Sequence, residues 1–408
     1  MKFVSSLAIA ASLIVGAAGA SAASAQQAQQ APAQPRKYNF SKEAQKALGE
    51  LQAATSGKTA DWAEKFAAAQ AVAKNSDDKY VLAKFQLQHA IDTNDQAAQL
   101  AAVDALLASG GADAAETAQL YAVIAGTASK NKDYARAEGA YAALAAANPN
   151  DPQAVVNLAS VKIELKKDAE ALALLQKAIG MSKSAGQKAP ESWYRNALGL
   201  AHKLNNASLA AQLAQETQQA YPTQNNFKNL IALSQADLAK DEQAYIDLMR
   251  LMQVSGNLQS GTDYLRLAQQ FEFERNWGEA KSVLEAAARA GKSSPAHTAL
   301  LNKVSAQIAE DKAALPGAEP KARNAPNGGL ALNLATVYAG YGDYAKAVDL
   351  YRVALQKGGV DANLVNTRLG IALAAAGQRA EAETAFRAVT GTRAPLANLW
   401  LNWLGQQR

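Results

Sequence analysis

The most constraining feature of the sequence is a helix–turn–helix pattern within residues 334–354. Apolar residues recur at helical spacing on both sides of Gly342-Asp343, a pair that favours a turn. This set is Leu334, Ala335, Tyr338, Ala347, Tyr351 and Ala354. Small alanines allow two helices to approach closely, and the tyrosines fill the wider gaps beside them. The pattern therefore predicts an interlocking helical hairpin.

The same pattern recurs along the chain at a nearly constant spacing. The next copy begins at Leu369, 35 residues after Leu334. Earlier copies are clear within residues 121–149, 155–178, 198–222 and 264–287, and looser within 227–251. Two weaker helix pairs precede them in residues 40–107. We therefore expect about nine helical hairpins.

These residues resemble the tetratricopeptide repeat, a 34-residue frame of two helices with small and aromatic residues at fixed positions. The copy that begins at Leu334 lacks only the closing proline of the frame, and Gly358-Gly359 stands in its place. The resemblance covers residues 40–403 and implies an all-α solenoid. The chain is also similar to Ala-rich exported proteobacterial tetratricopeptide proteins, a group without an assigned activity.

Composition shifts predict the order of the segments. We expect a signal peptide at 1–25, a flexible linker at 26–37, degenerate helical pairs at 38–111, central repeats at 112–314, a Pro/Gly-rich connection at 315–329, C-terminal repeats at 330–393 and a capping helix at 394–408. We predict a non-helical connection at 315–329 because three closely spaced prolines, Pro316, Pro320 and Pro326, are not expected inside a helix. The last helix carries Trp400 and Trp403 and is expected to cover the end of the stack. The alternative is that these two tryptophans form an exposed docking patch.

The first 25 residues have the layout of a secretory signal peptide. Lys2 precedes an apolar run from residue 3 to about residue 15, and small residues then offer cleavage after Ala22 or Ala25. The run is shorter than the roughly 20 residues that span a bilayer. We therefore expect export to a bacterial periplasm and no integral membrane segment after cleavage. The chain has no cysteine, which excludes thiol catalysis, thiolate metal sites and a lipoprotein anchor.

No catalytic, cofactor-binding or metal-binding motif is present in the sequence. The three histidines, His89, His202 and His297, are isolated, and each is expected on a helix surface or in a groove. The Gly57-Lys58-Thr59 stretch lacks the earlier glycine of a phosphate-binding loop. The net charge of +5 is spread along the chain, so no nucleic-acid partner is expected. We predict no catalytic residue, no cofactor and no metal.

The resemblance implies a concave groove lined by the first helix of each hairpin. The residues at groove positions that we expect to contact a partner are Asn157, Trp193, Asn196, Lys203, Arg266, Gln269, Phe273, Asn333, Thr336 and Arg368. A mixed polar and apolar groove suits a protein or peptide segment. The family's clamp for a C-terminal carboxylate is disfavoured, because Leu332 stands where that clamp needs lysine. The expected function is thus a non-catalytic scaffold or adaptor, and the sequence does not predict its oligomeric state.

Two other functions stay open at this point. The first is an envelope enzyme acting on glycan or peptidoglycan, with acidic groove residues such as Glu164 and Glu272. The second is a structural subunit of an envelope assembly, favoured if the end at Trp400 and Trp403 is exposed and apolar.

Overall fold

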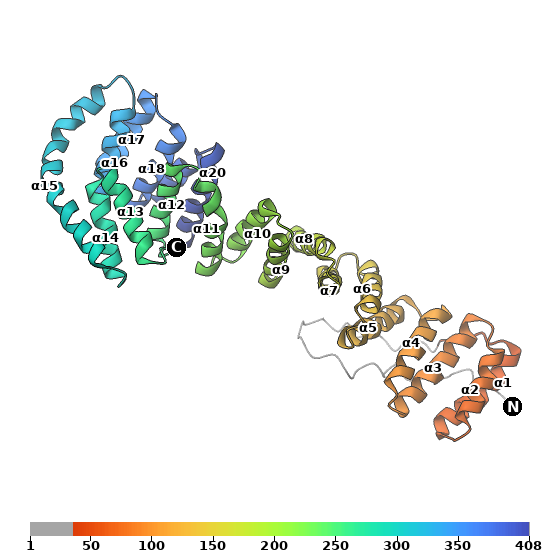
Figure 1. Cartoon of the computed structure of the whole chain (residues 1–408). Coiled ribbons are helices and arrows are strands. Elements are labelled where there is room, and N and C mark those ends of the chain that lie inside the picture. Colours follow the sequence, from red (N-terminus) through yellow and green to blue (C-terminus); the bar gives the residue numbers. More distant parts are fainter. Residues whose placement is uncertain (1–35, 408) are drawn as a thin grey trace. The chain divides into compact units, whose positions relative to one another are not determined.

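The computed structural model describes residues 36–407, and every regular element in that range is a helix (Figure 1). The expected signal peptide and residues 26–35 of the expected linker lie outside the described residues. The chain divides between Ala189 and Pro190 into two units, which are described separately. This division falls inside the stretch that we predicted as one block of central repeats.

The first unit contains four helical hairpins. They are formed by α1 (Lys42–Gly57) with α2 (Trp62–Val72), α3 (Ser76–Asp92) with α4 (Gln96–Ser109), α5 (Ala114–Lys130) with α6 (Tyr134–Ala147), and α7 (Pro152–Glu164) with α8 (Asp168–Ser184). Leu51, Leu106 and Leu120 are among the fully buried side chains of its core. The degenerate pairs expected in residues 38–111 are the first two of these hairpins.

Local chemistry sets the helix boundaries of the first unit. Asp113 and Asp133 accept backbone hydrogen bonds from Glu116 N (2.8 Å) and Arg136 N (3.2 Å), so each caps the N-terminus of its helix. Lys132, in the turn between α5 and α6, has a left-handed backbone with φ of 61°. At the N-terminus of α3, the buried Asp78 carboxylate accepts hydrogen bonds from the segment that precedes α1.

The second unit contains five more hairpins and three further helical segments. Its hairpins are α9 (Glu191–Lys203) with α10 (Ala207–Ala220), α11 (Gln224–Leu238) with α12 (Glu242–Val254), α13 (Gly261–Phe273) with α14 (Trp277–Arg289), α16 (Gly329–Gly340) with α17 (Tyr344–Lys357), and α18 (Ala362–Ala375) with α19 (Arg379–Arg387). The others are α15 (Pro295–Asn324), a 3-10 turn η1 (Gly391–Arg393) and α20 (Ala394–Gln406). Over residues 36–407 the hairpins number nine, which confirms the predicted all-α solenoid.

The helix α15 contradicts the connection that we expected at 315–329. It continues to Asn324 with Pro316 and Pro320 inside it, so only residues 325–328 connect α15 to α16. Proline disfavours a helix interior locally, but here tertiary contacts outweigh that preference. One such contact is the burial of Ala322, which is 2% exposed.

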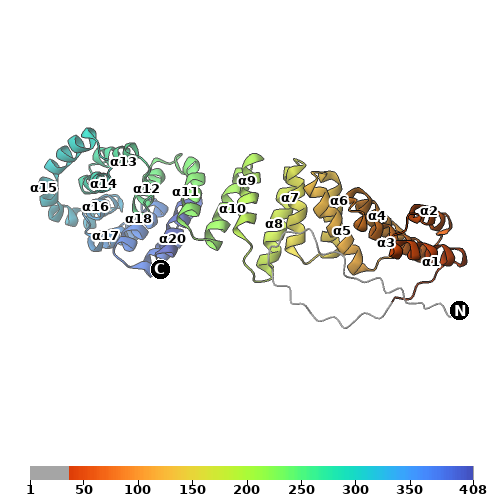
Figure 2. The ribbon, with the colours of Figure 1, turned by 90° about the horizontal axis from the view of Figure 1, so that it is seen from below.

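The C-terminal helix α20 packs against other helices of the second unit. Trp400 is buried and stacks on Phe386 of α19, with ring centroids 5.7 Å apart, while Trp403 is half-buried. Helix α20 packs against α11 and α12, and Figure 2 shows it beside α11. The last helices therefore return to the early helices of the same unit, and Trp400 does not form an exposed patch.

Candidate functional site

A surface hollow of about 480 Å³ lies between α11, α12 and α13 of the second unit. The residues that line it are Ala232, Gln235, Ala236, Ala239, Tyr245 and Arg266. Three of them are alanines, two on one face of α11 and Ala239 at the residue that ends it, and their short side chains leave the space open. The Tyr245 hydroxyl accepts a long hydrogen bond from Nε2 of Gln235, at 3.4 Å. The hollow thus has a small apolar floor and a polar wall.

Arg266 supplies the only charge among the residues that line this hollow. Its side chain is exposed and forms no hydrogen bond or ion pair with any other residue in the described range. A guanidinium group presents several donors in a fixed plane and binds carboxylates well. The hollow is therefore suited to an anionic group of a ligand.

Two more of the predicted partner-binding residues continue this surface along α13. Gln269 and Phe273 follow Arg266 at i+3 and i+7, which places the three on one face of the helix. All three are exposed, and the Phe273 ring is 82% exposed. An aromatic ring this exposed is uncommon, because burying it would be favourable. We call Arg266, Gln269 and Phe273 the α13 stripe.

Four other predicted partner-binding residues are accessible but lie on other helices. Asn196 and Lys203 on α9 and Asn333 on α16 are exposed. Asn157, on α7 of the first unit, is half-buried and accepts a hydrogen bond from Gln153 at 2.9 Å. None of these four lines the hollow.

The remaining three predicted partner-binding residues are buried, so the prediction that they face a partner is wrong. Trp193 is 7% exposed and belongs to the core of α9. Thr336 contacts the main-chain oxygen of Leu332 (3.0 Å) and the Tyr351 hydroxyl (3.1 Å). Arg368 points from α18 to α12, which covers the face that the repeat frame assigns to the groove.

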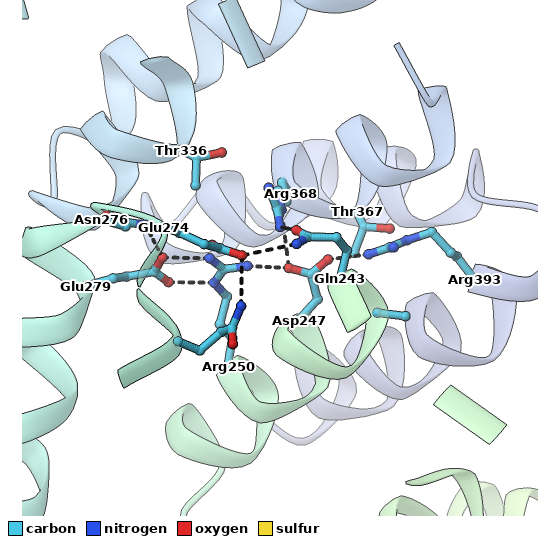
Figure 3. Close-up of polar contacts among 12 residues, drawn as sticks. Gln243, Asp247, Arg250, Glu274, Asn276, Glu279, Thr336, Thr367, Arg368 and Arg393 are labelled. Atoms are coloured by element: carbon cyan, nitrogen blue, oxygen red, sulfur yellow. Dashed lines mark hydrogen bonds and ion pairs between the residues drawn. The ribbon is translucent and has the colours of Figure 1, made fainter. Parts of the chain in front are cut away.

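Arg368 belongs to a buried polar cluster centred on the Asp247 carboxylate (Figure 3). Asp247 is fully buried and pairs with Arg250 on its own helix, with Arg368 on α18 (Nε–Oδ1 3.4 Å) and with Arg393 on η1. Arg250 also forms a two-pronged pair with Glu279 of α14, at 2.5 and 2.6 Å. The cluster therefore joins four separate elements of the second unit.

Arg393 also pairs with Asp241 at 3.2 Å, so three arginines meet three carboxylates, and the cluster serves the fold and leaves little to bind a ligand. Burial would lower the pKa of Arg250, but Glu279 and Asp247 together raise it above the ordinary value for arginine. Gln243 of α12 adds neutral contacts to Arg368 and to Glu274. No sequence signal could have identified the cluster, because Arg368 and Arg393 lie 121 and 146 residues from Asp247.

The acidic residues considered for catalysis are engaged in other contacts. Glu272 pairs with Lys303 at 2.7 Å, and Glu164, in the first unit, is hydrogen-bonded to Tyr134. His297 is buried and caps α15, accepting from Ser294 N at 3.1 Å, which corrects its expected surface position. No group of three or more His, Asp or Glu side chains converges as metal ligands would in residues 36–407.

Within the same described range, none of the helices combines the length and apolar composition that a membrane crossing requires.

Comparison with known proteins supports the repeat assignment. The family model for the tetratricopeptide repeat matches residues 128–184. No curated protein sequence matches the chain. The TPR2AB-domain:pHSP90 complex of yeast Sti1 is 14% identical, with 72% of this chain and 96% of that chain covered and a TM-score of 0.26.

Two further solved structures are similar at the same level. PilF of Pseudomonas aeruginosa is 16% identical, with 66% of this chain and 90% of that chain covered and a TM-score of 0.24. A tetratricopeptide repeat protein from Parabacteroides merdae is 16% identical, with 71% and 99% covered and a TM-score of 0.22. These scores are too low for an argument about function. Residues 128–184 thus match the tetratricopeptide repeat, and the described residues around them form a series of helical hairpins similar to that repeat.

Proposed function

We propose that this chain is a non-catalytic scaffold that binds a segment of a partner protein across the hollow and the α13 stripe. The proposal rests on one observation: Arg266, which forms no hydrogen bond or ion pair with a described residue, and the exposed Phe273 ring lie on the same face of one helix. Arginine and aromatic residues dominate the binding energy of protein interfaces. Tetratricopeptide repeat folds generally serve protein interaction, which fits this role.

The stripe also defines the chemistry of the segment that would bind. Arg266 and Phe273 are seven residues apart on a helix, which is roughly 10 Å at 1.5 Å per residue. An extended peptide covers roughly that distance in three residues. The proposed segment thus carries a carboxylate for Arg266 and an apolar side chain about three positions away for Phe273. Burying an exposed phenylalanine side chain would contribute about 1.5–3 kcal/mol.

Affinity capture with a charge-reversed variant tests this proposal. Tagged wild type and Arg266→Glu are compared in extracts of the native host by quantitative mass spectrometry. We expect at least one partner to fall by roughly tenfold or more, as for loss of a hot-spot residue. The matched control is Arg289→Glu on α14, an exposed arginine that likewise forms no ion pair with any described residue. Identical partner lists for Arg266→Glu and wild type would exclude binding at this surface.

We also propose that the protein works in the periplasm, on the basis of the signal-peptide pattern in residues 1–25. Fractionation of the host cell and N-terminal sequencing of the mature protein test this point. We expect a periplasmic protein that begins at Ala23 or Gln26. A cytoplasmic protein that retains Met1 would contradict it.

A further inference from the structure

The helix α15 is an insertion in an otherwise continuous stack. Helices α14 and α16 pack directly on each other, so the stack continues from one hairpin to the next without α15. Their backbones approach so closely at Gly278 and Gly340 that a side chain on either glycine would collide with the other helix. Figure 1 shows α15 following a curved course beside α14 and α16. The helix therefore has no role in continuing the stack.

The two halves of α15 differ in how they are held. In the first half, Val304 is fully buried, and His297 is hydrogen-bonded to the main-chain oxygen of Gly261 at 2.9 Å. Leu300, Leu301 and Ile308 add apolar contacts with the core that α13 and α14 share. This half is anchored like an ordinary core helix.

The second half, residues 315–324, is a poor helix by sequence. Pro316 and Pro320 have no backbone N–H, so the carbonyl groups four residues before them lose their helical hydrogen bonds. Gly317 between them lowers the helix preference further. Kinks in helices arise at prolines of this kind, which explains the curvature. The helical state of this segment therefore depends on contacts with other helices.

Those contacts combine a few apolar residues, Leu315, Ala318 and Ala322, which pack on the core of the second unit, with polar contacts at the surface. Glu319 accepts hydrogen bonds from the Tyr338 hydroxyl on α16 and from Nζ of Lys346 on α17, the latter at 2.6 Å. Arg323 pairs with Asp349, and both side chains are about half exposed. Pairs as exposed as this one contribute little to stability. Ala322 is the deeply buried side chain of the segment.

We propose that residues 315–324 form a releasable strap, which unwinds and lifts locally while the rest of the second unit stays folded. Opening of the strap uncovers the surface of α16 and α17 around Tyr338 and Lys346. Local opening of weakly held elements is common, and its free energy lies below that of global unfolding. The anchored first half of α15 keeps the released segment close to the surface of α16 and α17 that it covers when closed.

Cysteine labelling of the full-length chain tests the strap, because the natural sequence contains no cysteine. Ala322→Cys places a single thiol on the buried face of the strap itself. Ala335→Cys places one at a fully buried site in α16. We expect the thiol at 322 to react with a small reagent on the order of tenfold faster or more, since it needs only local opening. Equal rates at the two positions would overturn the proposal.

Two further variants in the Ala322→Cys background separate release of the strap from general instability. Glu319→Gln weakens the hydrogen bonds that hold the strap on α16 and α17, and it should raise the labelling rate several-fold. Pro316→Ala combined with Pro320→Ala strengthens the helix, and it should lower the labelling rate several-fold. Hydrogen exchange of residues 297–308 should not change in either variant. The control is Glu310→Gln, an exposed carboxylate of α15 with no ion pair to a described residue. A labelling rate at position 322 that changes in neither variant would also overturn the proposal.

Discussion

Removing the carboxylate of Asp247 tests the buried cluster that joins α12 to the last helices. Asp247→Ala leaves Arg368 inside the protein without its carboxylate, while Arg250 keeps Glu279 and Arg393 keeps Asp241 at 3.2 Å. Breaking a buried ion pair from one side costs about 3–5 kcal/mol, because the remaining charge is uncompensated. For a unit of this size, each kcal/mol lowers the midpoint of thermal unfolding by about 2–4 °C. We therefore expect the midpoint of the second unit to fall by roughly 6–20 °C.

Tryptophan fluorescence during heating is a suitable assay for Asp247→Ala. Four of the five tryptophans, Trp193, Trp277, Trp400 and Trp403, lie in the second unit, so the signal reports mainly on that unit. The control is Glu381→Ala, which breaks an exposed pair with Arg352 and should change stability by less than about 1 kcal/mol. If Asp247→Ala lowers the midpoint no more than Glu381→Ala does, the cluster does not hold these helices together.

Three further outcomes follow from local structure. Gly340→Ala should lower the free energy of unfolding by about 1–3 kcal/mol in urea titrations, because its methyl group would collide with Asn276. Lys132→Gly should raise that free energy by up to about 1 kcal/mol, because glycine adopts the left-handed backbone at this position without strain. Equal stability of the variant and the wild type would show that Lys132 is not strained. Burial opposes ionisation of Asp78, but hydrogen bonds led by that from Ser41 lower its pKa below 3.8. This stabilisation is present above about pH 4 and is lost as pH falls through the lowered pKa, so hydrogen exchange in α1 should accelerate there. Asp78→Asn should remove that pH dependence.

The hairpins could be predicted from sequence because their determinants are local. Spacings such as that of Ala347 and Tyr351 specify both the helix face and the partner helix a few residues away. The error at 315–329 has the opposite origin. Proline costs a helix about 3 kcal/mol locally, but contacts of Glu319 and Ala322 with distant residues override that cost.

The candidate site could be predicted only in part for the same reason. The repeat frame placed Arg266 and Arg368 at equivalent positions, and nothing within either repeat separates them. In the folded unit, α12 packs over the face of α18 that carries Arg368, whereas Arg266 faces the open hollow. The difference depends on helices that meet across more than 100 residues of sequence. The alanines in and just after α11 also gave no sequence signal that they would form the floor of a hollow.

Photo-crosslinking at the α13 stripe tests the central claim, that this surface binds a partner protein, most directly. A photoreactive amino acid replaces Gln269, which lies between Arg266 and Phe273, or replaces the exposed Arg289 on α14 as a control. We predict a discrete crosslinked protein at position 269 in living cells that is absent at position 289. This adduct should disappear when Arg266→Glu is added. No adduct at 269, or the same adducts at both positions, would contradict the claim.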